Sequence, residues 1–159
     1  MRNTILIALV SLVIFSCKKD TYSSIPKLTY KSVNTKTLYP KQVIKFTLNV
    51  TDAEGDISDT MYVQKININK VKDSCNISSF SDKYPVPKFP STKNLNQDIL
   101  VSFASGINIP IGAAPDKYYV NIAFGCSVND TCYFKFIIKD KANHKSDTVR
   151  SENIVIVKQ

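Results

Sequence analysis

The sequence is poor in the residues from which most active sites are built. It has one histidine, His144, and only two of its 21 basic residues are arginines. A lone histidine without any CxxC spacing gives no zinc-binding pattern. Lysine lacks the planar donor geometry with which arginine contacts phosphates and bases, so the net charge of +8 gives poor support to nucleic-acid binding. We therefore expect no nucleic-acid partner.

A catalytic constellation is also missing. No serine, cysteine or carboxylate forms a recognisable pattern with His144, which lies in a predicted turn. Glycoside hydrolysis needs two carboxyl groups at a fixed separation, usually from different elements around a cleft. The acidic residues of this chain instead concentrate in one short stretch. We expect the protein not to be an enzyme, with a small hydrolase as the alternative.

A long hydrophobic run is absent. The apolar residues 5–15 form a run of about eleven, whereas a membrane-spanning helix needs roughly twenty. Arg2 precedes this run, and Ser16 follows it directly before Cys17, which is the pattern of a cleaved signal peptide. We expect residues 1–16 to be removed, residues 17–25 to form a short polar tether, and residues 26–159 to form one domain.

The end of the apolar run resembles the bacterial lipobox. Residues 12–17 read LVIFSC, with Ile14 and Ser16 at the positions that the motif constrains. The resemblance implies that Cys17 is acylated and becomes the first residue of the mature protein, and several acyl chains anchor a protein stably. Residues 18–20, KKD, are similar to the start of Bacteroidota lipoproteins, which implies the outer membrane, facing the periplasm or the cell surface. An ordinary secreted protein with a chance cysteine is the alternative.

The rest of the chain has the two-residue period of half-buried strands and no amphipathic helix. The clearest case is residues 42–51, where apolar residues at 44, 46, 48 and 50 alternate with polar ones. Residues 72–96 are polar and contain several prolines, which predicts a crossing loop with room for at most one short edge strand. Val63 and Ile66 fall on opposite faces, so we expect a bulge between them. Predicted strands are residues 28–33, 42–51, 61–69, 98–104, 117–125, 132–139 and 153–157.

About seven short strands, each with one apolar face, predict an antiparallel β-sandwich. Residues 133–146, YFKFIIKDKANHKS, resemble the penultimate strand and following turn of bacterial immunoglobulin-like and fibronectin-III-like modules. Residues 46–57, FTLNVTDAEGDI, are similar to the strand and acidic turn of Bacteroidota lipoproteins of this type. The resemblance implies an immunoglobulin-like sandwich but no activity. Asn143 stands where the pattern has glycine, and asparagine tolerates the left-handed conformation that glycine would supply there.

Four carboxylates fall within eight positions between two predicted strands: Asp52, Glu54, Asp56 and Asp59. Calcium is bound by six to eight oxygens, and carboxylates that alternate along a flexible loop suit it. The pattern predicts a calcium site at one pole of the sandwich, as in a calcium-dependent adhesion module. The alternative is a polar turn in which the aspartates accept hydrogen bonds from backbone amides and no ion is bound.

The remaining cysteines are Cys75, Cys126 and Cys132. In an exported protein they can form a disulfide, and three thiols allow three single pairings. We favour the pair Cys126 and Cys132, because these residues flank a short loop that has the length of a hairpin connection.

A candidate ligand loop lies in the proline-containing stretch, where Tyr84 and Phe89 stand beside Pro85, Pro87 and Pro90. Sandwich modules often bind sugars or peptides through such loops. The sequence as a whole predicts a cell-envelope lipoprotein that presents a non-enzymatic binding or structural β-sandwich. Its expected partners are the membrane and an unidentified protein or glycan ligand, and the only cofactor considered is calcium.

Overall fold

Every regular element that the structure describes is a β-strand. The computed structural model describes residues 22–68, 80–86, 88, 90, 92–104 and 129–157. No helix in this part of the chain has the length and hydropathy that a membrane crossing requires. The strands are β1 (Lys27–Val33), β2 (Thr37–Leu38), β3 (Val43–Asp52), β4 (Ile57–Asn67), β5 (Phe80–Pro85), β6 (Leu95–Ala104), β7 (Asp130–Asp140), β8 (Val149–Arg150) and β9 (Ile154–Ile156).

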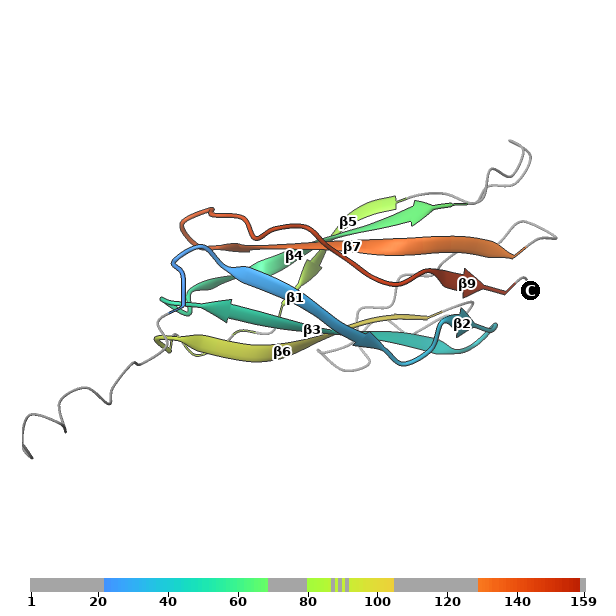
Figure 1. Ribbon diagram of the computed structural model, residues 1–159, viewed down its shortest axis with the longest axis horizontal. Helices are drawn as coiled ribbons and strands as arrows, with labels where there is room; N and C mark the ends of the chain where they lie inside the picture. Colours follow the sequence, from blue (N-terminus) through green and yellow to red (C-terminus); the bar gives the residue numbers. More distant parts are fainter. Residues whose placement is uncertain are drawn as a thin grey trace, which may run out of the picture.

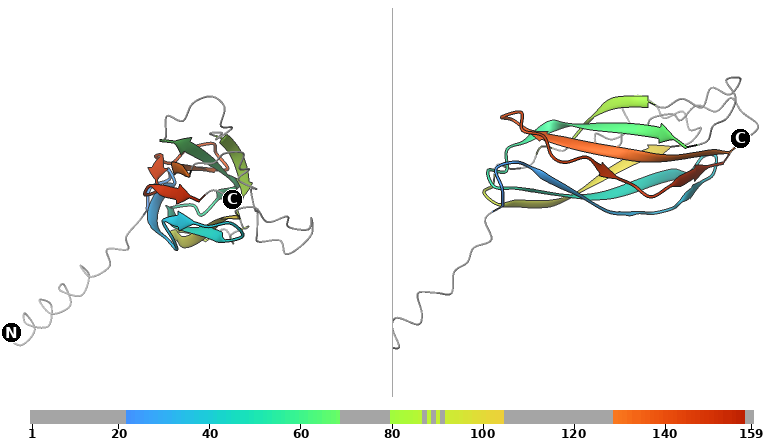
Figure 2. Two further views of the ribbon diagram at one scale, coloured as in Figure 1. Left: turned by 90° about the vertical axis from the view of Figure 1, so that its right-hand side faces the viewer. Right: turned by 45° about the horizontal axis from the view of Figure 1, so that its top comes forward.

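The strands form two sheets that face each other (Figures 1 and 2). One sheet has the order β1-β3-β6, and the other has the order β2-β9-β7-β4-β5, with β8 pairing with β7. Only β2 and β9 pair in parallel among the described strands. The order β1-β3-β6 against β9-β7-β4-β5 matches strands A-B-E and G-F-C-C′ of immunoglobulin-like sandwiches. The predicted all-β, immunoglobulin-like fold class is therefore confirmed.

The core lies between the two sheets and is centred on four phenylalanines. Phe46 and Phe103 belong to the three-stranded sheet, and Phe134 and Phe136 to the other. The ring centroid of Phe46 lies 4.8 Å from that of Phe134 and 5.3 Å from that of Phe136, while Phe103 stacks on Phe134 at 5.0 Å. All four side chains are fully buried. Removing one such ring typically costs about 3–5 kcal/mol, so these contacts lock the sheets together.

Alternation of apolar and polar residues located β3 and β7 correctly. In β3 the residues from Ile44 to Asp52 alternate between buried and more exposed positions, and β3 pairs with β6 without a register shift. In β7 every second residue from Asp130 to Asp140 is buried. The stretch predicted to be a crossing loop with room for at most one short edge strand contains such a strand, because β5 pairs only with β4 at the end of its sheet.

The predicted bulge in β4 was misplaced. The register with β7 shifts between Ile57 and Met61, and it runs unbroken through Val63 and Ile66. Lys65, rather than Ile66, takes the inward position after Val63 and is 2% exposed. Reasoning from apolar–polar alternation misses the inward position of Lys65, because it assigns the apolar Ile66 to the core and the lysine to solvent.

Tyr84 does not offer a ligand surface, contrary to the prediction. It lies within β5 and is 5% exposed, and its ring packs edge-on against Phe103 at 5.3 Å. Strand alternation turns Tyr84 into the core, whereas a loop would have left it in solvent. Phe89 lies outside the described residues, as do the predicted strand at 117–125, the signal segment 1–16 and the first residues of the tether.

Candidate metal centre at the loop pole

The first carboxylate of the candidate centre is the last residue of β3. Asp52 continues the inward positions of this strand, so its side chain lies where a further core residue would lie and is fully buried. Its Oδ2 accepts hydrogen bonds from the backbone N–H of Gly55 at 2.6 Å and, more weakly, of Asp56 at 3.4 Å. Its Oδ1 is buried without a hydrogen-bond partner. An unpaired buried oxygen of this kind is costly, and a water molecule or a cation bound beside it would satisfy it.

The charge of Asp52 is also poorly compensated. Burial raises the pKa of its carboxyl group above the ordinary value. The N–H groups of Gly55 and Asp56 partly oppose this effect, and the negative charges of Asp56 and Glu54 add to it. Burial and neighbouring charge of the same sign both disfavour the ionised form of Asp52, and a bound cation would offset both effects by its opposite charge.

Gly55 shapes the loop that carries Asp52 and Asp56. Its φ of 65° lies in the left-handed region, which glycine adopts without strain. A Cβ at this position would lie 2.2 Å from the backbone oxygen of Thr92. Ala53 on the same loop donates its N–H to Ser23 O at 3.0 Å and accepts from the N–H of Asn94 at 2.8 Å. The loop is thus held tightly between the segments at Ser23 and at 92–94.

The second buried carboxylate comes from the facing sheet. Asp140 ends β7 in an inward position, as Asp52 ends β3, and both strands end at the same pole (Figure 1). Asp140 Oδ1 accepts the backbone N–H of His144 at 2.7 Å, and Oδ2 lies 2.6 Å from His144 Nδ1. Asn143 makes this turn possible with a φ of 70°, so the expectation that asparagine adopts the left-handed conformation here is confirmed.

Asp52, Asp56 and Asp140 form a cluster in which one carboxylate oxygen from each lies within 4.8 Å of the others. We call this cluster the acidic triad. The two loops are also joined through the backbone, because the N–H of Lys141 donates to Asp56 O at 3.0 Å. Three carboxylates with only oxygen donors suit a hard divalent cation. The acidic triad could therefore hold a metal ion that links the β3–β4 loop to the turn after β7.

Only half of the predicted metal set belongs to the acidic triad. Glu54 is exposed, and Asp59 is an exposed residue of β4 that accepts a hydrogen bond from Thr60 Oγ1. Asp140 was missed, because it lies more than eighty residues from the acidic stretch at 52–59. The signal that could have found it is the inward parity of β7, which places Asp140 on the same face as Phe134 and Phe136.

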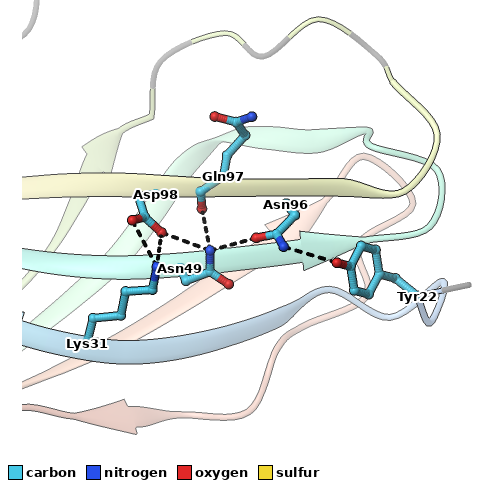
Figure 3. A network of polar contacts seen from close by, with 6 residues as sticks. All are labelled: Tyr22, Lys31, Asn49, Asn96, Gln97 and Asp98. Carbon is cyan, nitrogen blue, oxygen red and sulfur yellow. Dashed lines mark hydrogen bonds and ion pairs between the residues drawn. The ribbon is translucent and has the colours of Figure 1, made fainter. Parts of the chain in front are cut away.

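The segment before β1 is attached to the same pole by a polar network (Figure 3). Lys31 Nζ lies 2.7 Å from Asp98 Oδ1, and Asn49 Nδ2 donates to Asp98 Oδ1 and to Asn96 Oδ1, both at 2.8 Å. Asn96 Nδ2 in turn donates to the hydroxyl of Tyr22 at 3.0 Å. The hydrogen bonds from Lys31 and Asn49 hold the pKa of Asp98 below its usual range. The chain therefore contacts this end of the sandwich, which carries the acidic triad and which we call the loop pole, from Tyr22 onward, three residues before the expected end of the tether at residue 25.

No protein-family model matches the chain, and no curated protein matches it. Among solved structures it is similar to Spo0M, a sporulation control protein from Bacillus subtilis, with a TM-score of 0.43, 10% identity, and coverage of 85% of this chain and 50% of that one. It is also similar to a Niemann-Pick type C2 protein from Japanese carpenter ant, with a TM-score of 0.43, 11% identity, and coverage of 87% and 97%.

A third similar structure is the CARDB domain of a Pyrococcus furiosus protein, determined in complex with di-metal ions, with a TM-score of 0.34, 9% identity, and coverage of 87% and 100%. The chain spans half the length of the Spo0M chain. Likenesses of this strength assign no family, activity or ligand to the protein.

A second buried polar group lies farther along β4 and β7, and the sequence reasoning missed it. Lys65 of β4 forms an ion pair with Asp130 of β7, and both side chains are buried. Next to them, burial raises the pKa of the Cys132 thiol to about 12, and the charge of Asp130 adds to this effect. Cys126, the predicted disulfide partner of Cys132, lies outside the described residues, so this pairing stays a prediction.

Proposed function

We propose that the protein is a lipid-anchored, non-enzymatic β-sandwich module of the outer membrane, and that a calcium ion bound by the acidic triad stiffens its loop pole. The observation that carries the cation site is the buried Asp52 Oδ1, which has no hydrogen-bond partner and belongs to a cluster with Asp56 and Asp140. Calcium fits this set better than magnesium, because it tolerates irregular carboxylate ligands on loops, whereas magnesium demands near-ideal octahedral geometry.

The proposed anchor would place the acidic triad near the membrane. Cys17 lies five residues before Tyr22, and Tyr22 contacts the loop pole. Five extended residues reach about 18 Å. An acylated Cys17 would therefore hold the loop pole close to the membrane, and a cation that ties the β3–β4 loop to the turn after β7 would stiffen the anchored end.

A non-enzymatic role is supported by the surroundings of His144 and of Cys132, the cysteine in the part of the chain that the structure describes. His144 Nδ1 lies 2.6 Å from Asp140 Oδ2, an arrangement like the His–Asp pair of a catalytic Ser-His-Asp site. No serine or cysteine among the described residues, however, is hydrogen-bonded to His144. Ser146, two residues away, is buried, accepts the N–H of Ile138 and donates to Asp147 O. The Cys132 thiol, with a pKa near 12, stays protonated at neutral pH and is a poor nucleophile.

Calcium is expected to raise the melting temperature of the mature protein, measured in detergent micelles after removal of metal with EDTA. Extracellular calcium sites commonly have Kd values of about 0.1–1 mM. At ten times Kd, binding adds about 1.4 kcal/mol, which corresponds to a Tm rise of about 5 °C for a domain of this size. Asp52→Asn and Asp140→Asn should abolish the rise.

Asp59→Asn is the matched control, because it removes one negative charge from an exposed residue outside the acidic triad. It should keep the full calcium response. A Tm that stays constant up to 5 mM calcium, or a response that Asp59→Asn removes as completely as Asp52→Asn does, would reject the cation site.

Replacing Cys17 by alanine is expected to abolish incorporation of labelled palmitate and to move the protein from the membrane fraction to the soluble fraction. The reason is that several acyl chains on one residue supply the anchor. Cys75→Ala removes a different thiol from the same chain and should leave both readouts unchanged. Retention of Cys17→Ala in the membrane fraction would show that the anchor is not this lipid.

A further inference from the structure

The outward face of the larger sheet carries a shallow hollow between β5, β4 and β7. Strand alternation points the lining residues of β4 and β7 away from the core. The hollow has a volume of about 190 Å³. Three of its seven lining residues are lysines and none is acidic; the residues are Tyr62, Gln64, Ser81, Lys135, Ile137, Lys139 and Lys145.

On this face there are two pairs of basic residues, and the two members of each pair occupy directly opposite positions on neighbouring segments. Lys135 pairs with Arg150 across β7 and β8, and Lys139 pairs with Lys145 in an isolated bridge. Like charges at opposed cross-strand positions are destabilising. None of these four residues takes part in the ion pairs within the described ranges. On the other sheet, by contrast, Lys31 is paired with Asp98.

Tyrosine rings contact these cations. The guanidinium carbon of Arg150 lies 3.9 Å from the ring centroid of Tyr133, and Lys139 Nζ lies 5.1 Å from that of Tyr62. Lys135 also lies over Tyr133, at 5.9 Å. The negative faces of the rings partly offset the positive charge. Because cations cover these faces, the rings are not open platforms on which a nucleic-acid base would stack.

The spacing of the two cation pairs indicates which kind of anion could contact both. Lys135 and Lys139 lie four residues apart on β7, which is about 13 Å at the rise of a strand. A small anion cannot reach both pairs, whereas an extended polyanion can. Between them the hollow offers Gln64 and Ser81, which can exchange hydrogen bonds with hydroxyl groups.

We propose that this face binds an acidic polysaccharide, whose chain runs along β7 and places carboxylates at the Lys135–Arg150 and Lys139–Lys145 pairs. Lysine suits this ligand, because it interacts with anions as a point charge and needs no bidentate geometry. A concave surface with polar groups fits a sugar chain better than it fits the flat surface of a membrane. The inference rests on the proposed role as an envelope module but not on the calcium site.

The test is binding of fluorescent oligogalacturonate to the mature protein, measured by anisotropy in EDTA. The log of Kd should rise linearly with the log of salt concentration, as expected for a charge-driven contact. The double variant Lys135→Gln/Lys139→Gln should weaken binding at least tenfold. Its Tm should not fall, because the substitutions remove like-charge pairs.

The control variant Lys27→Gln/Lys45→Gln also removes two positive charges, but from exposed positions on β1 and β3 of the opposite sheet. Its Kd should stay within twofold of the wild-type value. Neutral dextran should not bind. Absence of binding, or equal loss in the control variant, would overturn the proposal. Tighter binding of single-stranded DNA, or of phosphatidylglycerol vesicles by the Cys17→Ala variant, which lacks the proposed lipid anchor, than of the oligogalacturonate would overturn the assignment to a glycan. Because EDTA is present, these results are separate from the calcium titration.

Discussion

Lys65→Ala is expected to lower the free energy of unfolding by about 3–5 kcal/mol, because it leaves the carboxylate of Asp130 buried without its cation. Both side chains are almost fully excluded from solvent, at 2% and 4% exposure. They join β4 to β7, two neighbouring interior strands of the larger sheet. Urea unfolding at neutral pH measures the effect. A loss below about 1 kcal/mol would show that water reaches this pair in solution.

The matched variant replaces both partners. Lys65→Met together with Asp130→Leu removes both buried charges and keeps the branching of the side chain at residue 130, where leucine is bulkier than aspartate. Replacement of a buried ion pair by apolar residues is often neutral or stabilising, so the double variant should be within about 1.5 kcal/mol of the wild type. The difference between a Lys65→Met single variant and this double variant then measures the burial of an unpaired charge, because residue 65 has the same volume in both.

Gly55→Ala is expected to cost more than about 2 kcal/mol and to abolish the calcium response. A left-handed conformation costs an alanine roughly 1–2 kcal/mol, and the new Cβ would meet the backbone oxygen of Thr92 at 2.2 Å. Because this neighbour is backbone, the loop itself must move. That movement displaces the N–H that bonds Asp52 Oδ2 and separates Asp52 from Asp56. Thermal unfolding with and without calcium measures both effects.

Asn143→Gly supplies the control, because Asn143 also has a left-handed conformation in a turn at the same pole. Glycine adopts this conformation more readily than asparagine does, so the variant should lie within about 0.5 kcal/mol of the wild type and keep its calcium response. If Gly55→Ala were equally mild, the close contact with residue 92 would not exist in solution.

Local pattern explains which features could be predicted from the sequence. The alternation from Ile44 to Val50 has one structural solution, a strand with one buried face, and β3 follows it. Asn143 announces its left-handed turn because few other residues tolerate that conformation. The inward position of Lys65 could not be predicted in this way. A lysine at an inward position is stable only with a buried partner, and that partner, Asp130, lies more than sixty residues away in the sequence.

The candidate centre shows the same division. The sequence by itself determined that carboxylates are concentrated at the end of β3 and in the residues that follow it. It also determined that one histidine and two arginines give poor support to a zinc site or a nucleic-acid site. Only the tertiary structure decided that Asp140 joins Asp52 and Asp56, that Glu54 and Asp59 stay outside, and that lysines oppose lysines and arginine on one sheet face. The physical reason is that periodicity is a property of neighbouring residues, whereas the meeting of β3 and β7 at one pole depends on how the two sheets pair and pack.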